Sequence, residues 1–459
     1  MRWVCFGGSE QVRSPIIVSS SYDSKSNTVE TSSKLVNSFS VGLPSYRSDF
    51  VPARRDNLHV TPEPTDLFRL QYSLPVNCRL AASINKFDAL QLYKATTHPL
   101  AATAVAAFRN VGLQLKLDLT KFQNFSLAVE ATMKPNSYHN SLHVVDVLHL
   151  MYLQTISRGP IEAMCCDPIV KLAVILSALV HDLAHPGYNN AFLIATNHDI
   201  VKQYGKVAPA ESMHLAEFKR LISEPNNNFV EELSQSDRER LFHYVEQTVL
   251  ATDMSKHMDY IREPVPLDPE QRLLFTLAFA MKVSDMSHNL RSFPVHNKFV
   301  DMLKEEFYQQ GDRERQLELQ ITLGMDRDEA YADIGEFQVR FLSAFISPLL
   351  ERWYSHSGQS PLVKEMQRCL LENISMWSML SIREGLSERE DDCAELSTSQ
   401  RVARKLMRRP TQAFANGYGM HTQRHDISRA IDVFKRSYAS HSLRKSIDRS
   451  RLTVPHGAV

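Results

Sequence analysis

Apolar residues recur every three or four positions over residues 76–385. One example is the set Phe337, Phe341, Phe345 and Leu349, in which each member follows the previous one by four residues. This spacing places apolar side chains on one face of an α-helix. The alternating runs of Val, Ile and Thr that are typical of strands are scarce. The pattern predicts an all-α fold in which residues 76–385 form one compact multi-helix domain.

The segments on either side of this domain differ from it. Residues 1–75 are rich in Ser, Thr and Pro without a sustained hydrophobic period, which predicts a mostly disordered N-terminal extension. Residues 386–459 are polar and then basic, which predicts a flexible C-terminal tail, with docking to an acidic lipid or protein surface as the alternative. The stretch Arg408-Arg409-Pro410-Thr411 resembles a site for basic-directed kinases, so phosphorylation of Thr411 is a further expectation.

Composition and charge exclude several classes of protein. The chain has 459 residues with 52 Lys and Arg against 52 Asp and Glu, so it lacks the positive field of a dedicated nucleic-acid-binding protein. The longest apolar stretch, residues 169–180, is shorter than the ~20 residues that span a bilayer, so no transmembrane segment is expected. The six cysteines form no CxxC pair and the N-terminus has no signal-peptide pattern, which favours a reduced, cytoplasmic protein.

Histidines and aspartates gather at three places in the helical zone. The first is the stretch His139, His143 and Asp146, whose spacing would put all three on one face of a helix. Two imidazoles one helical turn apart can bind a metal ion. Histidines at the surface or at the edge of the core also explain such a pair, so this stretch alone is only suggestive.

The other two places supply carboxylates at the ends of apolar runs. His181 and Asp182 directly follow the apolar run 172–180, and a buried imidazole and carboxylate are costly unless they are paired or bind a metal. Asp285 also follows an apolar helical run, although capping of a neighbouring helix or a solvent-facing position would explain it too. With His143 these residues form a set of nitrogen and oxygen donors that suits Zn²⁺, with Mg²⁺ or Mn²⁺ at a neighbouring water-rich site. Two such cations can activate a water for attack on a phosphoryl group.

Longer motifs, taken in order, carry a family resemblance. They are His139-Asn140-x-x-His143-x-x-Asp146-Val147, His181-Asp182-x-x-His185-Pro186-Gly187 and Ser284-Asp285-x-Ser287, together with residues 251–257, 305–314 and 337–342. In this order they resemble the class I 3',5'-cyclic nucleotide phosphodiesterases. The similarity covers residues 75–385 and implies an all-α catalytic domain of the HD type.

The resemblance implies a chemical role for the residues already singled out. The ligands of the first metal, Zn²⁺, would be His143, His181, Asp182 and Asp285. Asp182 would bridge to a second metal, Mg²⁺ or Mn²⁺, and a hydroxide held between the two would attack the phosphorus of the cyclic nucleotide. His139 would protonate the departing O3' as general acid, with Glu306 keeping its imidazole charged. The product would be the 5'-monophosphate, which ends cyclic nucleotide signalling.

Other matching positions would support the metals and the substrate. Those expected near the metals or their waters are His185, Glu211, His214 and Asp253. Those expected to contact the substrate are Tyr138, His288, Leu303, Gln338 and Phe341. Gln338 would hold the purine edge through its amide, while Phe341 would stack on the purine with Leu303 opposite.

Two departures from the family pattern affect turnover and base preference. Residues 204–210 lack the Asn, Asp and Ser that usually precede Glu211, so local hydrogen bonding should differ there. His288 replaces an Asn that would contact adenine in the cAMP-preferring members. We nevertheless expect cAMP to be favoured over cGMP, because residues 86–135 and 337–380 are most similar to the cAMP-hydrolysing branch.

Two other functions stay open at this stage. An HD-type phosphohydrolase acting on a linear nucleotide would lack both the purine clamp of Gln338 and Phe341 and the acid pair of His139 and Glu306. A catalytically impaired nucleotide-binding scaffold would keep the fold without turnover, and only the altered stretch before Glu211 favours it. A homodimer is a further expectation that the sequence leaves open.

Overall fold

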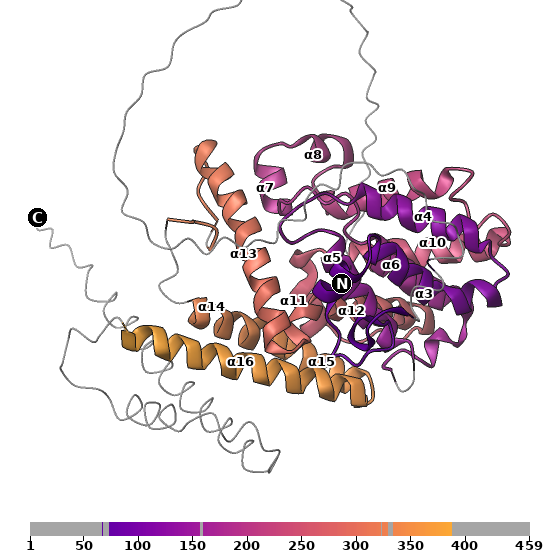
Figure 1. Cartoon of the computed structure of the whole chain (residues 1–459). Helices are drawn as coiled ribbons and strands as arrows, with labels where there is room; N and C mark the ends of the chain where they lie inside the picture. The colour runs from indigo at the N-terminus through magenta and orange to yellow at the C-terminus, as the bar shows by residue number, and fades with distance from the viewer. Residues whose placement is uncertain (1–66, 68–72, 157–158, 323, 329–333, 388–459) are drawn as a thin grey trace, which may run out of the picture. The chain divides into compact units, whose positions relative to one another are not determined.

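The computed structural model describes residues 67, 73–156, 159–322, 324–328 and 334–387. Every regular element in these ranges is a helix and none is a strand (Figure 1), which confirms the predicted all-α fold. The first helices are α2 (Ala89–Ala95), α3 (Pro99–Gln114), α4 (Leu119–Thr132), α5 (Ser141–Gln154), α6 (Pro168–Val180), α7 (Asn190–Ala195), α8 (Asp199–Tyr204) and α9 (Pro209–Ser223). The later ones are α10 (Gln235–Leu250), α11 (His257–Arg262), α12 (Pro269–Asp285), α13 (Phe293–Gln316), α14 (Ile334–Phe341), α15 (Ser347–His356) and α16 (Pro361–Ser387). Short turns of other helix types are η1 (Val76–Cys78), η2 (Met164–Cys166), η3 (Met254–Lys256), η4 (Ser287–Leu290) and the π-helical η5 (Leu342–Ile346).

Capping side chains and prolines determine where many of these helices begin. Asp118 and Asp167 each accept backbone N–H groups in the first turns of α4 and α6, and Asn140 does the same for α5. Pro168 and Pro269 occupy the first helical positions of α6 and α12, where the N–H that proline lacks would have had no partner within the helix. These local signals fix the helix ends at which the candidate site residues lie.

Helix α6 lies in the core of the molecule. All of its residues from Ile169 to Val180 are buried except Lys171. It packs against α3, α5, α10 and α12, as a helix that is apolar on every side must. The end of α6 therefore lies inside the protein, where it is followed directly by His181 and Asp182.

The C-terminal helices form a second group of contacts. Helix α16 runs along α14 and α15 and also packs against α13 (Figure 1). Between α14 and α15 the chain adopts the π-helical turn η5, which inserts an extra residue into the helical repeat. The predicted apolar stripe breaks there for this reason: Leu349 is buried, whereas Phe345 is 41% exposed and stacks on Phe341 at 5.7 Å between ring centroids.

Several predictions concern parts of the chain that the structure does not describe. Most of the N-terminal extension, the tail beyond Ser387 and Thr411 lie outside the described residues. Leu74 is already buried and α16 continues to Ser387; the domain boundaries at 75/76 and 385/386 stay predictions. None of the described helices combines the length and the apolar character needed to cross a membrane.

Candidate active site

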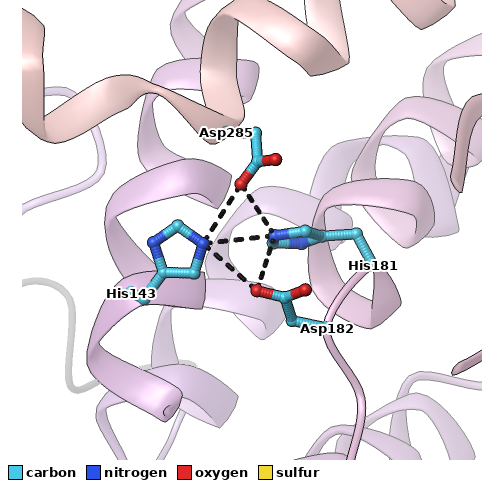
Figure 2. A group of neighbouring side chains, drawn as sticks. All are labelled: His143, His181, Asp182 and Asp285. Atoms are coloured by element: carbon cyan, nitrogen blue, oxygen red, sulfur yellow. Dashed lines mark hydrogen bonds and ion pairs between the residues drawn. The ribbon is translucent and has the colours of Figure 1, made fainter. Parts of the chain in front are cut away.

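Four side chains from three helices converge on one point. His143 lies in the first turn of α5, His181 and Asp182 follow the last residue of α6, and Asp285 is the last residue of α12. Figure 2 shows their nitrogen and oxygen atoms pointing toward one another. The predicted set of two histidines and two aspartates is therefore assembled in the structure, although its members are up to 142 residues apart in the sequence.

The donor atoms of this group are arranged around a common centre. The Nε2 atoms of His143 and His181 are 3.4 Å apart. Asp182 Oδ2 lies 3.3 Å from each of these nitrogens, and Asp285 Oδ1 lies 3.2 Å from the first and 3.4 Å from the second. All four atoms lie within 4.8 Å of one another, which is the separation expected of ligands that share one ion.

The hydrogen bonds around the group indicate that these atoms present lone pairs. His181 Nδ1 lies 3.0 Å from the carbonyl oxygen of Ala178, to which it can only donate, so Nε2 is the nitrogen that carries the lone pair when the ring is neutral, as a metal requires. Asp182 Oδ2 is buried and accepts no hydrogen bond from the described residues. A buried carboxylate oxygen without a donor is costly unless a cation binds it. His143, His181, Asp182 and Asp285, called the metal group below, therefore fit a divalent metal ion.

His139 lies beside this group, but not on the helix that the spacing predicted. Asn140 is extended, with φ −136° and ψ −177°, and its side chain accepts from Leu142 N–H, so α5 begins only at Ser141. Asn residues favour this capping position because their side chain replaces the missing helical acceptor. His139 precedes the cap, and its ring stacks on that of His185 at 4.0 Å instead of continuing the helix face of His143.

The predicted pair of His139 and Glu306 is present. His139 Nδ1 bonds to Glu306 Oε1, while Glu306 Oε2 accepts the backbone N–H groups of Tyr138 at 2.7 Å and of His139 at 3.0 Å. Burial lowers the pKa of His139, but the negative charges of Glu306 and Asp182 outweigh burial and raise the pKa to about 9. Burial raises the pKa of Glu306, and the adjacent His139 outweighs it and lowers that pKa to about 2. The pair therefore consists of an imidazolium and a carboxylate.

His185 and His214 lie next to Asp182. His214 Nδ1 bonds to the carbonyl oxygen of Leu183 at 2.6 Å, and its Nε2 lies 3.8 Å from Asp182 Oδ1. Burial lowers the pKa of His214 to about 4 and the pKa of His185 well below its usual value, so both rings are neutral. Asp182, His185 and His214 form a further group whose donor atoms lie within 4.8 Å of one another.

After the altered stretch, Glu211 is held by a side chain from another helix. Ala208 precedes α9 with φ +46° and has no side chain that could cap it. Asn190 of α7 bonds to the start of α9: its Oδ1 accepts from Ala210 N–H at 3.1 Å and its Nδ2 donates to Glu211 Oε2 at 2.9 Å. Burial raises the pKa of Glu211, and the negative charges of Asp253 and Asp182 contribute to that rise. Glu211 thus keeps its place near the metal group despite the missing residues.

The predicted substrate residues are only partly brought together. Tyr138 is buried, with its ring centroid 4.7 Å from that of His143 and 5.6 Å from that of His288. Gln338 is buried in α14, while Phe341 at the end of α14 and Leu303 in α13 are half-buried. Among the described residues, no hydrogen bond or ring contact joins the last three to one another. The purine clamp stays a prediction.

Sequence reasoning missed the buried cations near the site. Asp146 is fully buried and bonds to Arg291 Nε at 2.9 Å and to Ser287 Oγ at 2.5 Å, so it holds η4 against α5 instead of joining the metal group. Lys282 is also fully buried and donates to the carbonyl oxygens of residues 251–253 at 2.9–3.2 Å. The signal for Lys282 was present in the sequence as a charge inside an apolar run; Arg291 had no such signal.

Comparison with known proteins identifies the family. The family model of the 3'5'-cyclic nucleotide phosphodiesterases matches residues 138–370, about half of the chain. The chain is 28% identical over 289 residues to the cGMP-specific 3',5'-cGMP phosphodiesterase 3 of Dictyostelium discoideum, covering 61% of this chain and 60% of that protein. It is also 28% identical over 259 residues to the probable 3',5'-cyclic-AMP phosphodiesterase pde-4 of Caenorhabditis elegans, covering 53% of this chain. The chain spans 60% of the length of the first of these relatives and 38% of the second.

A solved structure supports the same conclusion for the fold. The phosphodiesterase domain of the RhoPDE fusion protein from the choanoflagellate Salpingoeca rosetta superposes with a TM-score of 0.60 at 24% sequence identity. The match covers 68% of this chain and 98% of that one. The metal group and the acid pair both lie on the part of the chain that the family model covers, residues 138–370. The chain belongs to the 3',5'-cyclic nucleotide phosphodiesterase family.

Proposed function

We propose that the chain hydrolyses a 3',5'-cyclic nucleotide to its 5'-monophosphate, with cAMP favoured over cGMP. The observation that carries the proposal is the pair of His139 and Glu306 next to four inward-facing metal ligands. The adenine preference rests on the similarity of residues 86–135 and 337–380 to the cAMP-hydrolysing branch. The relatives named above include one cGMP-type and one cAMP-type enzyme.

Some residues of the site would bind the metals, and others would transfer a proton. His143, His181, Asp182 and Asp285 would hold the first divalent cation, with Asp182 reaching toward the second. When bound, Zn²⁺ and Mg²⁺ or Mn²⁺ would activate a water and neutralise charge on the phosphoryl group. His185, His214, Glu211 and Asp253 would orient this water-rich side through hydrogen bonds.

His139 would act as the general acid for the departing O3'. Its Nδ1 is held by Glu306, so the proton that it can give away is the one on Nε2. The charge of Glu306 keeps the imidazole protonated near neutral pH, which is the state a general acid requires. At the other end of the substrate, Gln338 would hold the purine edge, with Phe341 and Leu303 on either side of the ring.

Two observations count against the alternative functions. A phosphohydrolase acting on linear nucleotides was expected to lack the pair of His139 and Glu306, and the pair is present. A scaffold without turnover was favoured only by the altered stretch 205–210, and Glu211, which follows this stretch, is held by Asn190 at 2.9 Å.

The test measures release of 5'-AMP and 5'-GMP from cAMP and cGMP by the full chain with Mg²⁺ or Mn²⁺. We expect His139→Ala to lower kcat about 100-fold or more, because it removes a general acid. The same variant should lose much less activity on bis(para-nitrophenyl) phosphate, whose leaving group needs no proton. His243→Ala is the matched control, since His243 is exposed on α10. Equal losses on both substrates would exclude His139 as the acid, and absence of product from either cyclic nucleotide would refute the proposed function.

A further inference from the structure

Two stacked imidazoles beside the metal group lie outside every helix. His139 precedes the capping residue of α5, and His185 lies in the turn between α6 and α7. Their rings stack at 4.0 Å between centroids, with an angle of 26° between the ring planes. A side chain on a turn keeps its position only if other groups hold the backbone of that turn. The backbone contacts of these two residues therefore decide where the proposed general acid lies.

One side chain joins the two backbones. Asn136 Nδ2 donates to the carbonyl oxygen of His139 at 2.9 Å and to the carbonyl oxygen of His185 at 2.8 Å. Both partners are acceptors, so the amide nitrogen must face them, and its two hydrogens can serve both at once. Asn136 is half-buried and lies 49 residues before His185 in the sequence. Its amide thus links the turn of the proposed acid to the turn that follows α6.

Asn136 is itself held from two directions. Its carbonyl oxygen accepts Asn140 Nδ2 at 2.9 Å, and Asn140 also caps α5, the helix that carries His143. On the other side, the turn that contains His185 reaches Asn136 at Gly187. Gly187 has φ +80°, and a Cβ there would lie only 3.1 Å from Asn136 Oδ1. Glycine therefore allows this turn to approach the amide closely.

Glu306 and Asn136 hold different parts of His139. Glu306 bonds to Nδ1 of the ring, accepts the backbone N–H at 3.0 Å and supplies the negative charge described above. Asn136 holds the carbonyl side of the same residue and adds no charge. Loss of Glu306 should therefore change the pKa of the imidazole, whereas loss of Asn136 should change the position of the imidazole.

We propose that Asn136 is a positioning residue for proton transfer: by holding the backbones of His139 and His185 together, it keeps the His139 imidazole stacked on His185 and beside the metal group. Both amide hydrogens of Asn136 are used by the two carbonyl oxygens, so Asn136 acts on the reaction only through the two histidines. The role of His139 as general acid rests on the proposed function, whereas the link between the two histidines rests on the hydrogen bonds alone.

The first test removes the amide and compares two leaving groups. Asn136→Ala should lower kcat for the cyclic nucleotide about tenfold, less than His139→Ala does, because the acid is still present but is no longer held in place. On bis(para-nitrophenyl) phosphate, whose leaving group needs no proton, kcat should change less than about twofold. A general loss of packing or of metal would instead lower both rates alike.

Asn124→Ala is the matched control. Asn124 Nδ2 also donates to a distant backbone carbonyl oxygen, that of Asn226, at 3.2 Å, but this bond joins α4 to the segment before α10. It has no contact with either histidine of the stacked pair. We therefore expect both rates to stay unchanged in Asn124→Ala.

A double-mutant cycle shows whether Asn136 acts through His139. In the His139→Ala background, Asn136→Ala should cause no further fall in kcat for the cyclic nucleotide. The inference is wrong if the same fall appears again in that background, or if Asn136→Ala lowers the rates of both substrates equally. If Asn136→Ala does not fold, Gly187→Ala changes the same contact from the other side, because its methyl group would face Asn136 Oδ1. It should cause the same selective loss, and wild-type rates on both substrates would count against the inference.

A structural measurement separates this inference from the proposed function. A stacked ring shifts the NMR signals of the ring protons next to it, so the ring protons of His139 report its contact with His185. Among the 18 histidines, the signals of His139 are those missing from His139→Ala. We expect them to move towards those of an unstacked imidazole in Asn136→Ala and to stay in place in Asn124→Ala. Unchanged signals in Asn136→Ala would overturn the inference, whereas an inactive wild-type chain whose signals move as expected would refute only the proposed function.

Discussion

Replacing Glu306 by Gln tests the acid pair most directly. The substitution removes one charge and keeps the shape of a side chain that is 3% exposed. A glutamine carbonyl oxygen can still accept the backbone N–H groups of Tyr138 and His139, which Glu306 Oε2 accepts at 2.7 Å and 3.0 Å. The variant should therefore still fold, but it should lose the negative charge that stabilises the His139 imidazolium.

The magnitude follows from the pKa of His139. Glu306 and Asp182 raise this pKa from 6.5 to about 9 against the opposing effect of burial, which corresponds to about 3 kcal/mol in favour of the charged ring. Glu306 raises the pKa both through its charge and through its bond to the ring, so most of the rise is lost with it. Without it, burial should bring the pKa to 6.5 or below. At about pH 8 the protonated fraction would fall from about 90% to about 3%, roughly a thirtyfold loss of kcat.

The assay is the pH dependence of kcat for the wild-type chain and for Glu306→Gln. A raised pKa keeps the acid protonated on the low-pH side and loses it as pH rises, so the alkaline limb of the variant should move to lower pH by at least one unit. Near pH 6 the two enzymes should differ by only a few-fold. Glu305→Gln is the control, because Glu305 is its partly exposed neighbour and pairs with Arg327. The reasoning fails if Glu306→Gln keeps the alkaline limb of the wild-type chain.

Three further substitutions probe other parts of the site. Asp285→Ala should abolish activity together with binding of the first metal, and elemental analysis of the purified variant that still finds this metal would contradict the assignment. Asp146→Ala should lower the free energy of unfolding by about 3–5 kcal/mol, measured by urea denaturation, because it leaves the guanidinium of Arg291 buried without its carboxylate; a change below about 1 kcal/mol would show that the pair does not support the fold. Phe341→Ala should raise KM about tenfold with little change in kcat, because it removes stacking on the base but no group near the phosphate; steady-state kinetics with an unchanged KM would remove Phe341 from the clamp.

The metal group could be predicted because three of its four ligands follow apolar helical runs, whereas His143 was only suggestive on its own. His181, Asp182 and Asp285 follow apolar runs that have to be buried, so the ends of those helices have to lie inside the protein. A polar residue at a buried helix end needs a partner. The nitrogen and oxygen donors that gather there limit which metal ion they can bind. The position of His139 was predicted less well, since the spacing to His143 outweighed the capping preference of the Asn140 between them.

The long-range partners could not be predicted, because nothing in the sequence links them. Asp146 has the same spacing from His143 as a further ligand on that helix face would have, yet its carboxylate is taken by Arg291, 145 residues later. Whether a carboxylate becomes a metal ligand or part of a structural ion pair depends on which side chain the fold places opposite that carboxylate. The same holds for His296 and Trp377, which are 81 residues apart and meet only because α13 packs on α16.

Helix α12 shows how the scaffold and the chemistry depend on each other. It carries Lys282 and Asp285 one turn apart at the end where it enters the site. Burial lowers the pKa of Lys282 to about 8, but its ammonium donates all three hydrogens to the carbonyl oxygens of residues 251–253, which follow the negative end of α10. One helix thus positions a metal ligand directly and holds the backbone of Asp253 through a buried cation. The separation between these two carboxylates is therefore set by the packing of α12 on α10.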